Sequence, residues 1–195
     1  MQALIVVSHP LTTSLTHAVA AAVASGIAQA NPANRSEIAD LTQEGFSPAF
    51  SGADYAAFQL TGPTPPDVAA EQARIDRADA LVLVFPVYWW SMPGMLKGWI
   101  DRVFSNGWAY DVTPEEKIVK KLGHLPVHLV MLGASGQHTY EKHGYADALH
   151  AQISHGIFDY CGAPVITAEL LLMEEQGTPD AYLDAAYHIG RRVFG

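Results

Sequence analysis

The sequence has few of the features that mark secreted, membrane or nucleic-acid-binding proteins. Cys161 is the one cysteine among 195 residues, so no internal disulfide can form, and a cytoplasmic location is expected. No apolar run could span a bilayer, and the first residues lack a basic segment and a cleavage site, so neither membrane insertion nor a signal peptide is expected. Lys and Arg number 11 against 20 Asp and Glu, and a net charge of −9 argues against nucleic acid as a partner.

Several motifs that would point to a specific chemistry are also missing. Neither the dinucleotide-binding GxGxxG pattern nor the phosphate-binding GxxxxGK[ST] loop occurs. Residues 133–136 lack the spacing of the GxSxG elbow, which argues against a Ser-His-Asp hydrolase. Among the nine histidines, His138 and His143 lie five residues apart, as do His150 and His155. Metal ligands on one helix face are four apart, so no metal site is expected.

Apolar runs and helical periodicities alternate about five times along the chain. The pattern predicts a single α/β domain over residues 1–195, with a five-stranded parallel sheet in the order 2-1-3-4-5 and helices on both faces. Strands are predicted at 3–7, 36–41, 80–85, 126–132 and within 163–173. Helices are predicted at 15–30, 53–59, 67–78, from 91 to 104, at 146–160 and from 178 to 193, and one exposed helical turn within 113–121.

The most informative stretch begins at the third predicted strand. Residues 80–85 form an unbroken apolar run, which is typical of a strand buried on both faces. Tyr88, Trp89 and Trp90 follow at its carboxyl end and cannot all point inward, so at least one should face a flat ligand. Ser91 is expected to cap the next helix.

Two further loops are predicted at the same edge of the sheet. Residues 8–14 are rich in hydroxyl groups and lead into a helix, whose free N–H groups and positive dipole end favour a phosphate. Residues 133–137 are small and let the backbone approach a ligand closely. Hydroxyls for a phosphate, an aromatic surface and backbone N–H groups together suit a flavin.

The chain resembles the flavodoxin-like NAD(P)H:quinone oxidoreductases, the DT-diaphorase and modulator-of-drug-activity group. The resemblance is carried by residues 8–10 with Ser14, by residues 66–72, by the FPVYWW run at 85–90 and by residues 93–104. It implies a cytoplasmic homodimer that binds FAD, with FMN as the alternative. It also implies NAD(P)H as co-substrate and a quinone or another small electron acceptor, which receives two electrons in a ping-pong cycle through flavin N5.

The resemblance also assigns roles to individual residues. Tyr110 is expected to reach the active site of the partner subunit, and Val112 stands where mammalian members carry a second tyrosine. Tyr140 and His143 are expected to hydrogen-bond the charge that develops on flavin or quinone oxygen. The expected flavin contacts are His9, Thr13, Ser14, Leu15, Thr16, Pro86, Val87, Tyr88, Trp89, Trp90, Gly133, Ala134 and Tyr140.

Two other functions are compatible with this fold. One is a flavodoxin that carries electrons, although His9-Pro10 stands where carriers have a tight Thr/Ser-Gly phosphate loop. The other is a regulatory flavoprotein subunit of a potassium-efflux system, because relatives of this fold associate with such systems.

Overall fold

Five parallel strands form the central sheet of the computed structural model, which describes residues 1–173 and 177–195. Counted along the chain, the sheet order is 2-1-3-4-5, so the predicted order is confirmed. The apolar runs of the first and third strands lie in the middle of the sheet, where both faces are covered. The strands, in spatial order, are β2 (Arg35–Asp40), β1 (Gln2–Val7), β3 (Ala80–Pro86), β6 (Val127–Gly133) and β7 (Val165–Leu172).

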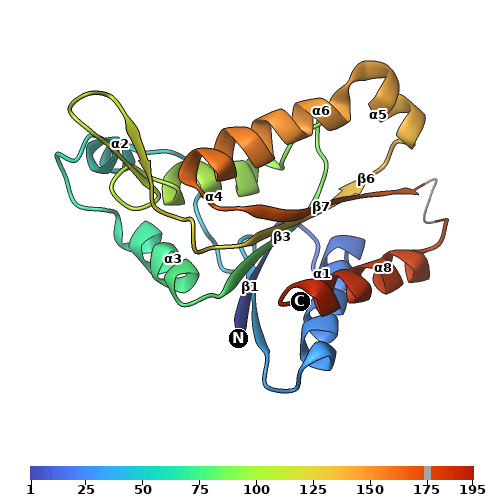
Figure 1. Cartoon of the computed structure of the whole chain (residues 1–195). Coiled ribbons are helices and arrows are strands. Elements are labelled where there is room, and N and C mark those ends of the chain that lie inside the picture. Colours follow the sequence, from blue (N-terminus) through green and yellow to red (C-terminus); the bar gives the residue numbers. More distant parts are fainter. Residues whose placement is uncertain (174–176) are drawn as a thin grey trace.

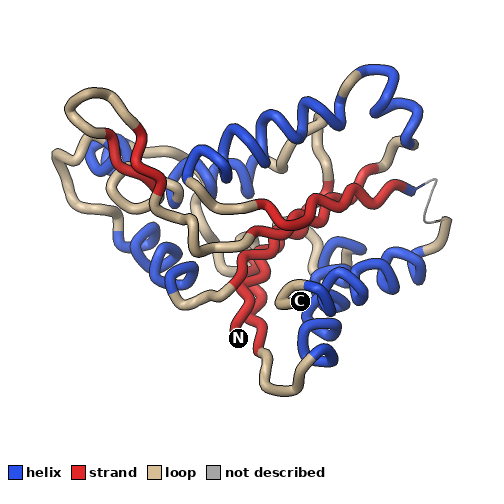
Figure 2. The backbone as a smooth tube through the Cα atoms, in the orientation of Figure 1, coloured by secondary structure: helices blue, strands red, loops and turns tan. Residues whose placement is uncertain are grey.

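Helices cover both faces of this sheet (Figure 1; Figure 2). Alternate residues of β1, β3 and β6 enter two separate cores. In β3, Leu83 and Phe85 belong to one core, whereas Val82 and Val84 belong to the other. The first core lies under α3 (Pro66–Asp76), α4 (Gly94–Val103) and the continuous pair α6 (Tyr145–Leu149) and η1 (His150–Asp159). The second core lies under α1 (Leu15–Ala30) and α8 (Pro179–Arg192).

The backbones of α1 and α8 pack against each other through glycine. A side-chain carbon at Gly26 would overlap the carbonyl oxygen of Tyr187, and one at Gly190 would overlap the carbonyl oxygen of Val23. Glycine at both positions therefore lets the two helices lie in direct backbone contact on one face of the sheet.

The connection between β2 and α3 contains α2 (Gly52–Phe58) and is held against α4 by a buried ion pair. The Arg102 guanidinium donates to Asp54 at 2.9 Å and to Asp67 at 2.6 Å. Burial alone would raise the pKa of Asp54, but hydrogen bonds from Ser51 and Arg102 lower it overall, so this carboxylate stays charged.

Three local predictions are wrong. The 113–121 segment holds no helical turn; it contributes to an antiparallel hairpin of β4 (Tyr110–Val112) and β5 (Ile118–Lys120), in which β-branched residues favour strand. Ser91 does not cap α4, because the helix begins only at Gly94, with Pro93 at the cap position, and the Ser91 hydroxyl donates to Gln152 instead. A short helix, α5 (Gln137–His143), follows β6 where only a loop was expected.

Cys161 lies buried just after the η1 helix. Burial raises the pKa of its thiol to about 11, so the thiol stays protonated at neutral pH and is no nucleophile. Within residues 1–173 and 177–195, no three His, Cys, Asp or Glu side chains gather as a metal site. In the same ranges no helix is both long and apolar enough to cross a membrane.

Candidate functional site

Three loops meet at the carboxyl edge of the sheet. β1 pairs with β3 and β3 pairs with β6, so the loops that follow these strands, 8–14, 87–93 and 134–136, are neighbours. In open α/β sheets, ligands bind at this edge, where successive connections leave toward opposite faces. The strand order therefore brings together the three loops that the sequence singles out.

The first loop leads into the amino end of α1. Ser14 caps this helix, because its Oγ accepts the backbone N–H of His17 at 3.3 Å. His9 folds back on the loop, and its Nδ1 accepts the N–H of Leu11 at 3.1 Å. The first N–H groups of a helix have no partner within it, so they and the helix dipole favour an anion here. The residues predicted to hold the phosphate and ribityl end all lie in this loop or first turn: His9, Thr13, Ser14, Leu15 and Thr16.

A hydrogen-bonded chain that the sequence analysis missed runs behind this cap. Ser14 Oγ lies 2.8 Å from His17 Nδ1, and His17 Nε2 lies 2.7 Å from Asp40 Oδ2. The His17 and Asp40 side chains are each 16% exposed. Asp40 ends β2, and its other oxygen accepts the backbone N–H groups of Thr42 and Gln43. In the sequence, this hydrogen-bonded chain is marked only by a histidine three residues after a capping serine. Its carboxylate partner, Asp40, comes from a distant strand, so the spacing of residues does not reveal it.

The second loop is a tight turn with two tryptophans at its centre. Tyr88 and Ser91 exchange backbone hydrogen bonds of 3.0 and 3.1 Å, while Trp89 and Trp90 have φ angles of +48° and +59°. Two positive φ angles are typical of a type I′ turn, which favours Asn-Gly. A bulky residue in this conformation costs on the order of 1–2 kcal/mol. Strain of this kind is concentrated at functional sites.

The two tryptophans face different surroundings. Trp89 is 94% exposed, which confirms that at least one of the three aromatic residues points outward. Trp90 stacks on Tyr145 with ring centroids 3.8 Å apart, and it meets the edge of Tyr140 at 5.3 Å. His143 in turn stacks against Tyr145 at 5.3 Å. An aromatic cluster therefore joins the second loop to the third.

Tyr140 packs against the end of β6. A side-chain carbon at Gly133 would come within 2.7 Å of the Tyr140 hydroxyl, so only glycine permits this contact. Burial raises the pKa of Tyr140, which keeps the hydroxyl protonated and able to donate a hydrogen bond. A hollow of about 130 Å³ opens here, lined by Val87, Trp89, Trp90, Ala134, Ser135 and Tyr140.

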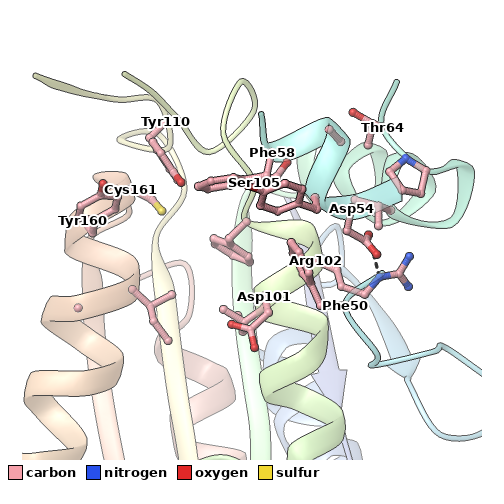
Figure 3. A pocket seen from close by; sticks show the side chains of 18 residues that line it. Phe50, Asp54, Phe58, Thr64, Asp101, Arg102, Ser105, Tyr110, Tyr160 and Cys161 are labelled. Carbon is pink, nitrogen blue, oxygen red and sulfur yellow. Dashed lines mark hydrogen bonds and ion pairs between the residues drawn. The ribbon is translucent and has the colours of Figure 1, made fainter. Parts of the chain in front are cut away.

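Tyr110 does not join this cluster within one chain. It lies edge-on to Tyr160, with ring centroids 5.1 Å apart, beside a second and larger cavity of about 500 Å³ (Figure 3). This cavity lies between α2, the last turn of α4 and the end of η1. Because α4 begins near the tryptophan turn, its 10 residues, or about 15 Å, separate the two sites. The apolar side chains around the cavity include Phe50, Phe58, Ile100, Phe104 and Ile157.

Comparison with known proteins gives a consistent result. Residues 1–188 match the family model described as Flavodoxin-like fold. A Haemophilus influenzae protein named an uncharacterized NAD(P)H oxidoreductase is 29% identical over 172 residues, which cover 87% of this chain and 83% of that protein. NAD(P)H dehydrogenase (quinone) 1 of Rattus norvegicus is 30% identical over 122 residues, which cover 62% of this chain and 44% of that protein. The chain thus spans less than half the length of this mammalian relative.

Solved structures agree with the sequence matches. The NAD(P)H:quinone oxidoreductase from Methanothermobacter marburgensis has a TM-score of 0.89 and 27% identity, with 98% of each chain covered. The chain therefore belongs to the flavodoxin-like fold family, and its homologues include NAD(P)H:quinone oxidoreductases.

Proposed function

We propose that this protein is a flavin-dependent NAD(P)H:quinone oxidoreductase that reduces quinones by two electrons in a ping-pong cycle. The observation that carries the proposal is the strained tryptophan turn, which lies between a helix amino end and a loop of small residues. The names of the rat and archaeal relatives, both of which specify a quinone, support the choice of acceptor.

The residues at the carboxyl edge fit the three parts of a flavin. Ser14 and the first N–H groups of α1 suit its phosphate. The exposed ring of Trp89 offers a flat surface beside the half-buried Trp90. Gly133 and Ala134 offer backbone N–H groups for the polar edge of the ring. When bound, the flavin supplies hydride transfer through N5, with FAD as the expected form and FMN as the alternative.

The side chains near the hollow have a limited chemical task. Tyr140 holds its proton, because burial raises its pKa, and donates a hydrogen bond to negative charge that develops on an acceptor oxygen. His143 is exposed and stacked on Tyr145, which places a second hydrogen-bonding group at the edge of the aromatic cluster. Nicotinamide and quinone use the same open surface in turn, as a ping-pong cycle requires.

We infer that the active unit is a homodimer in which Tyr110 completes the site of the partner subunit. Within one chain, the length of α4 separates Tyr110 from the tryptophan turn. Exposed apolar surface such as that around the larger cavity is typical of a protein interface. A partner subunit that covers the site would exclude water from the reduced flavin ring. Exposed side chains with large apolar surfaces line the larger cavity: Phe50, Tyr55, Phe58 and Tyr160. Figure 3 labels three of them, Phe50, Phe58 and Tyr160.

Steady-state oxidation of NADH and NADPH by the flavin-loaded protein, at several fixed quinone concentrations, tests the proposal. Parallel lines in double-reciprocal plots are expected, because the two substrates occupy one surface in turn. The mass of the cofactor released on denaturation identifies FAD or FMN. A flavin-loaded protein that oxidises neither nucleotide when quinone is present would refute the enzymatic function and favour an electron carrier.

A further inference from the structure

We propose that His17 and Asp40 are positioning residues that decide whether the Ser14 hydroxyl can donate a hydrogen bond to the phosphate of the ligand. Phosphate binding would then take up one proton at His17. The inference rests on the proposed function, which puts the flavin phosphate at the amino end of α1. Its basis is the hydrogen-bonded chain from Ser14 through His17 to Asp40.

Asp40 fixes the tautomer of the neutral imidazole. A carboxylate only accepts hydrogen bonds, so His17 Nε2, 2.7 Å from Asp40 Oδ2, carries the ring proton. His17 Nδ1 then has a lone pair, and the Ser14 hydroxyl must donate to it across 2.8 Å. The same hydroxyl oxygen accepts the backbone N–H of His17. In this state the hydroxyl proton of Ser14 is directed at His17 and is not available to a phosphate oxygen.

A second proton on His17 reverses this arrangement. Both ring nitrogens then donate, and Nδ1–H directs its hydrogen bond to Ser14 Oγ. The hydroxyl proton must turn toward another acceptor, and a phosphate oxygen at the first turn of α1 is such an acceptor. The proton taken from solvent stays on Nδ1, and no covalent bond of the ligand changes. The imidazolium also brings positive charge toward the anion.

Other groups near His17 have to be separated from this effect. Two titratable side chains from other elements contact the His17 ring, Asp40 from the end of β2 and His9 from the loop after β1. The His9 ring lies edge-on to His17, with centroids 6.3 Å apart. A protonated His9 could also bring charge toward the ligand, so the test uses variants in which His9 is unchanged.

Asp40→Asn is the most discriminating variant. The N–H groups of Thr42 and Gln43 both point at Asp40 Oδ1, at 3.1 and 3.2 Å, so the asparagine oxygen takes that position and its NH₂ faces His17. The NH₂ donates to Nε2, and the neutral ring then carries its proton on Nδ1. This frees the Ser14 hydroxyl at every pH. Ser14→Ala is the matched control, because it keeps the His17–Asp40 pair and removes the hydroxyl that the pair directs.

The experiment is a calorimetric titration of the flavin-free protein with FAD and with FMN, from about pH 5 to about pH 8, where histidine titrates. Two buffers with different heats of ionisation report the protons taken up. For the wild type, affinity is expected to fall on the order of tenfold as pH rises, the effect of one charge-assisted hydrogen bond. Proton uptake is expected in the same pH range.

The two variants separate the hydroxyl from the charge of the ring. Asp40→Asn is expected to show little pH dependence and no proton uptake, and Ser14→Ala is expected to lose most of the pH dependence. Comparison of variant and wild type at each pH cancels the titration of His9 and of the ligand itself.

Two results would overturn the inference. If Ser14→Ala keeps the full pH dependence of the wild type, His17 acts through its charge alone. If the wild type binds flavin with the same affinity at every pH, His17 does not direct the hydroxyl. Flavin binding without pH dependence would leave the proposed function intact, whereas absence of binding to either flavin would overturn both.

Discussion

Replacement of Trp89 by asparagine is expected to stabilise the flavin-free protein. Trp89 is 94% exposed, so its removal sacrifices little buried surface, and its φ of +48° is a conformation that asparagine tolerates far better. Relief of the backbone strain is worth on the order of 1 kcal/mol. For a chain of 195 residues this corresponds to a rise in Tm of about 2–4 °C.

Trp90→Asn is the matched control. Its φ of +59° predicts the same relief of strain, but the substitution also removes the stack on Tyr145 and the edge contact with Tyr140. Loss of an aromatic pair and of half-buried apolar surface costs about 2–3 kcal/mol. The net effect is a lower Tm, so the same substitution at two adjacent positions should shift Tm in opposite directions.

Scanning calorimetry measures the Tm of both variants. Flavin-free protein is used because bound flavin raises the Tm, and it raises it most in the protein that binds flavin most tightly. Calorimetric flavin titration of Trp89→Asn should show an affinity reduced by up to about tenfold, the contribution of one stacking surface. A lower Tm for Trp89→Asn than for the wild type would refute the assignment of strain to the turn.

Four further predictions concern other parts of the molecule. Tyr140→Phe should slow the oxidation of the reduced flavin by quinone on the order of 100-fold in stopped flow, and an unaltered rate would remove Tyr140 from the mechanism. Tyr110→Ala should raise KM for the quinone and leave flavin affinity as it is; an unchanged KM would contradict its role across a dimer. Arg102→Met should cost about 3–5 kcal/mol in urea unfolding, because it leaves Asp54 buried without its cation, and Arg102→Met combined with Asp54→Leu should recover part of the loss. A loss below about 1 kcal/mol would mean that Ser51 alone satisfies Asp54. Burial lowers the pKa of His128, so its imidazole takes up a proton more readily in the unfolded chain than in the folded protein. The contribution of His128 to the free energy of unfolding should therefore be complete above about pH 6.5 and should be lost as the pH drops. His128→Gln should lose less stability in acid than the wild type, and equal losses in both proteins would contradict this.

The fold could be predicted because its signals are local. The first and third strands are continuous apolar runs that need two covered faces, and this fixes them in the middle of a parallel sheet. α1 begins and ends where the sequence predicts, since Ser14 supplies the cap and Asn31-Pro32 ends the helical pattern. Both features are decided by residues close together in the chain.

The features that the sequence analysis missed depend on tertiary contacts. His17 and Asp40 lie 23 residues apart, and only the pairing of β2 with β1 brings the carboxylate to the helix. Trp89 and Trp90 occupy a turn that local propensity assigns to Asn-Gly, so the conformation of this turn could not be predicted from the residues themselves. Ser91 looks like a helix cap, but it ends that turn, the helix begins three residues later at Gly94, and its hydroxyl bonds Gln152.

The proposed function depends most directly on whether the three loops at the carboxyl edge hold a flavin. Titration of the flavin-free protein with FAD and with FMN, followed by visible difference spectra and calorimetry, measures this. The predicted result is saturable binding with a perturbed flavin spectrum, weakened by Trp89→Asn and unaffected by Tyr110→Ala. A protein that stays colourless with both flavins, and gives no heat of binding, would contradict the proposal.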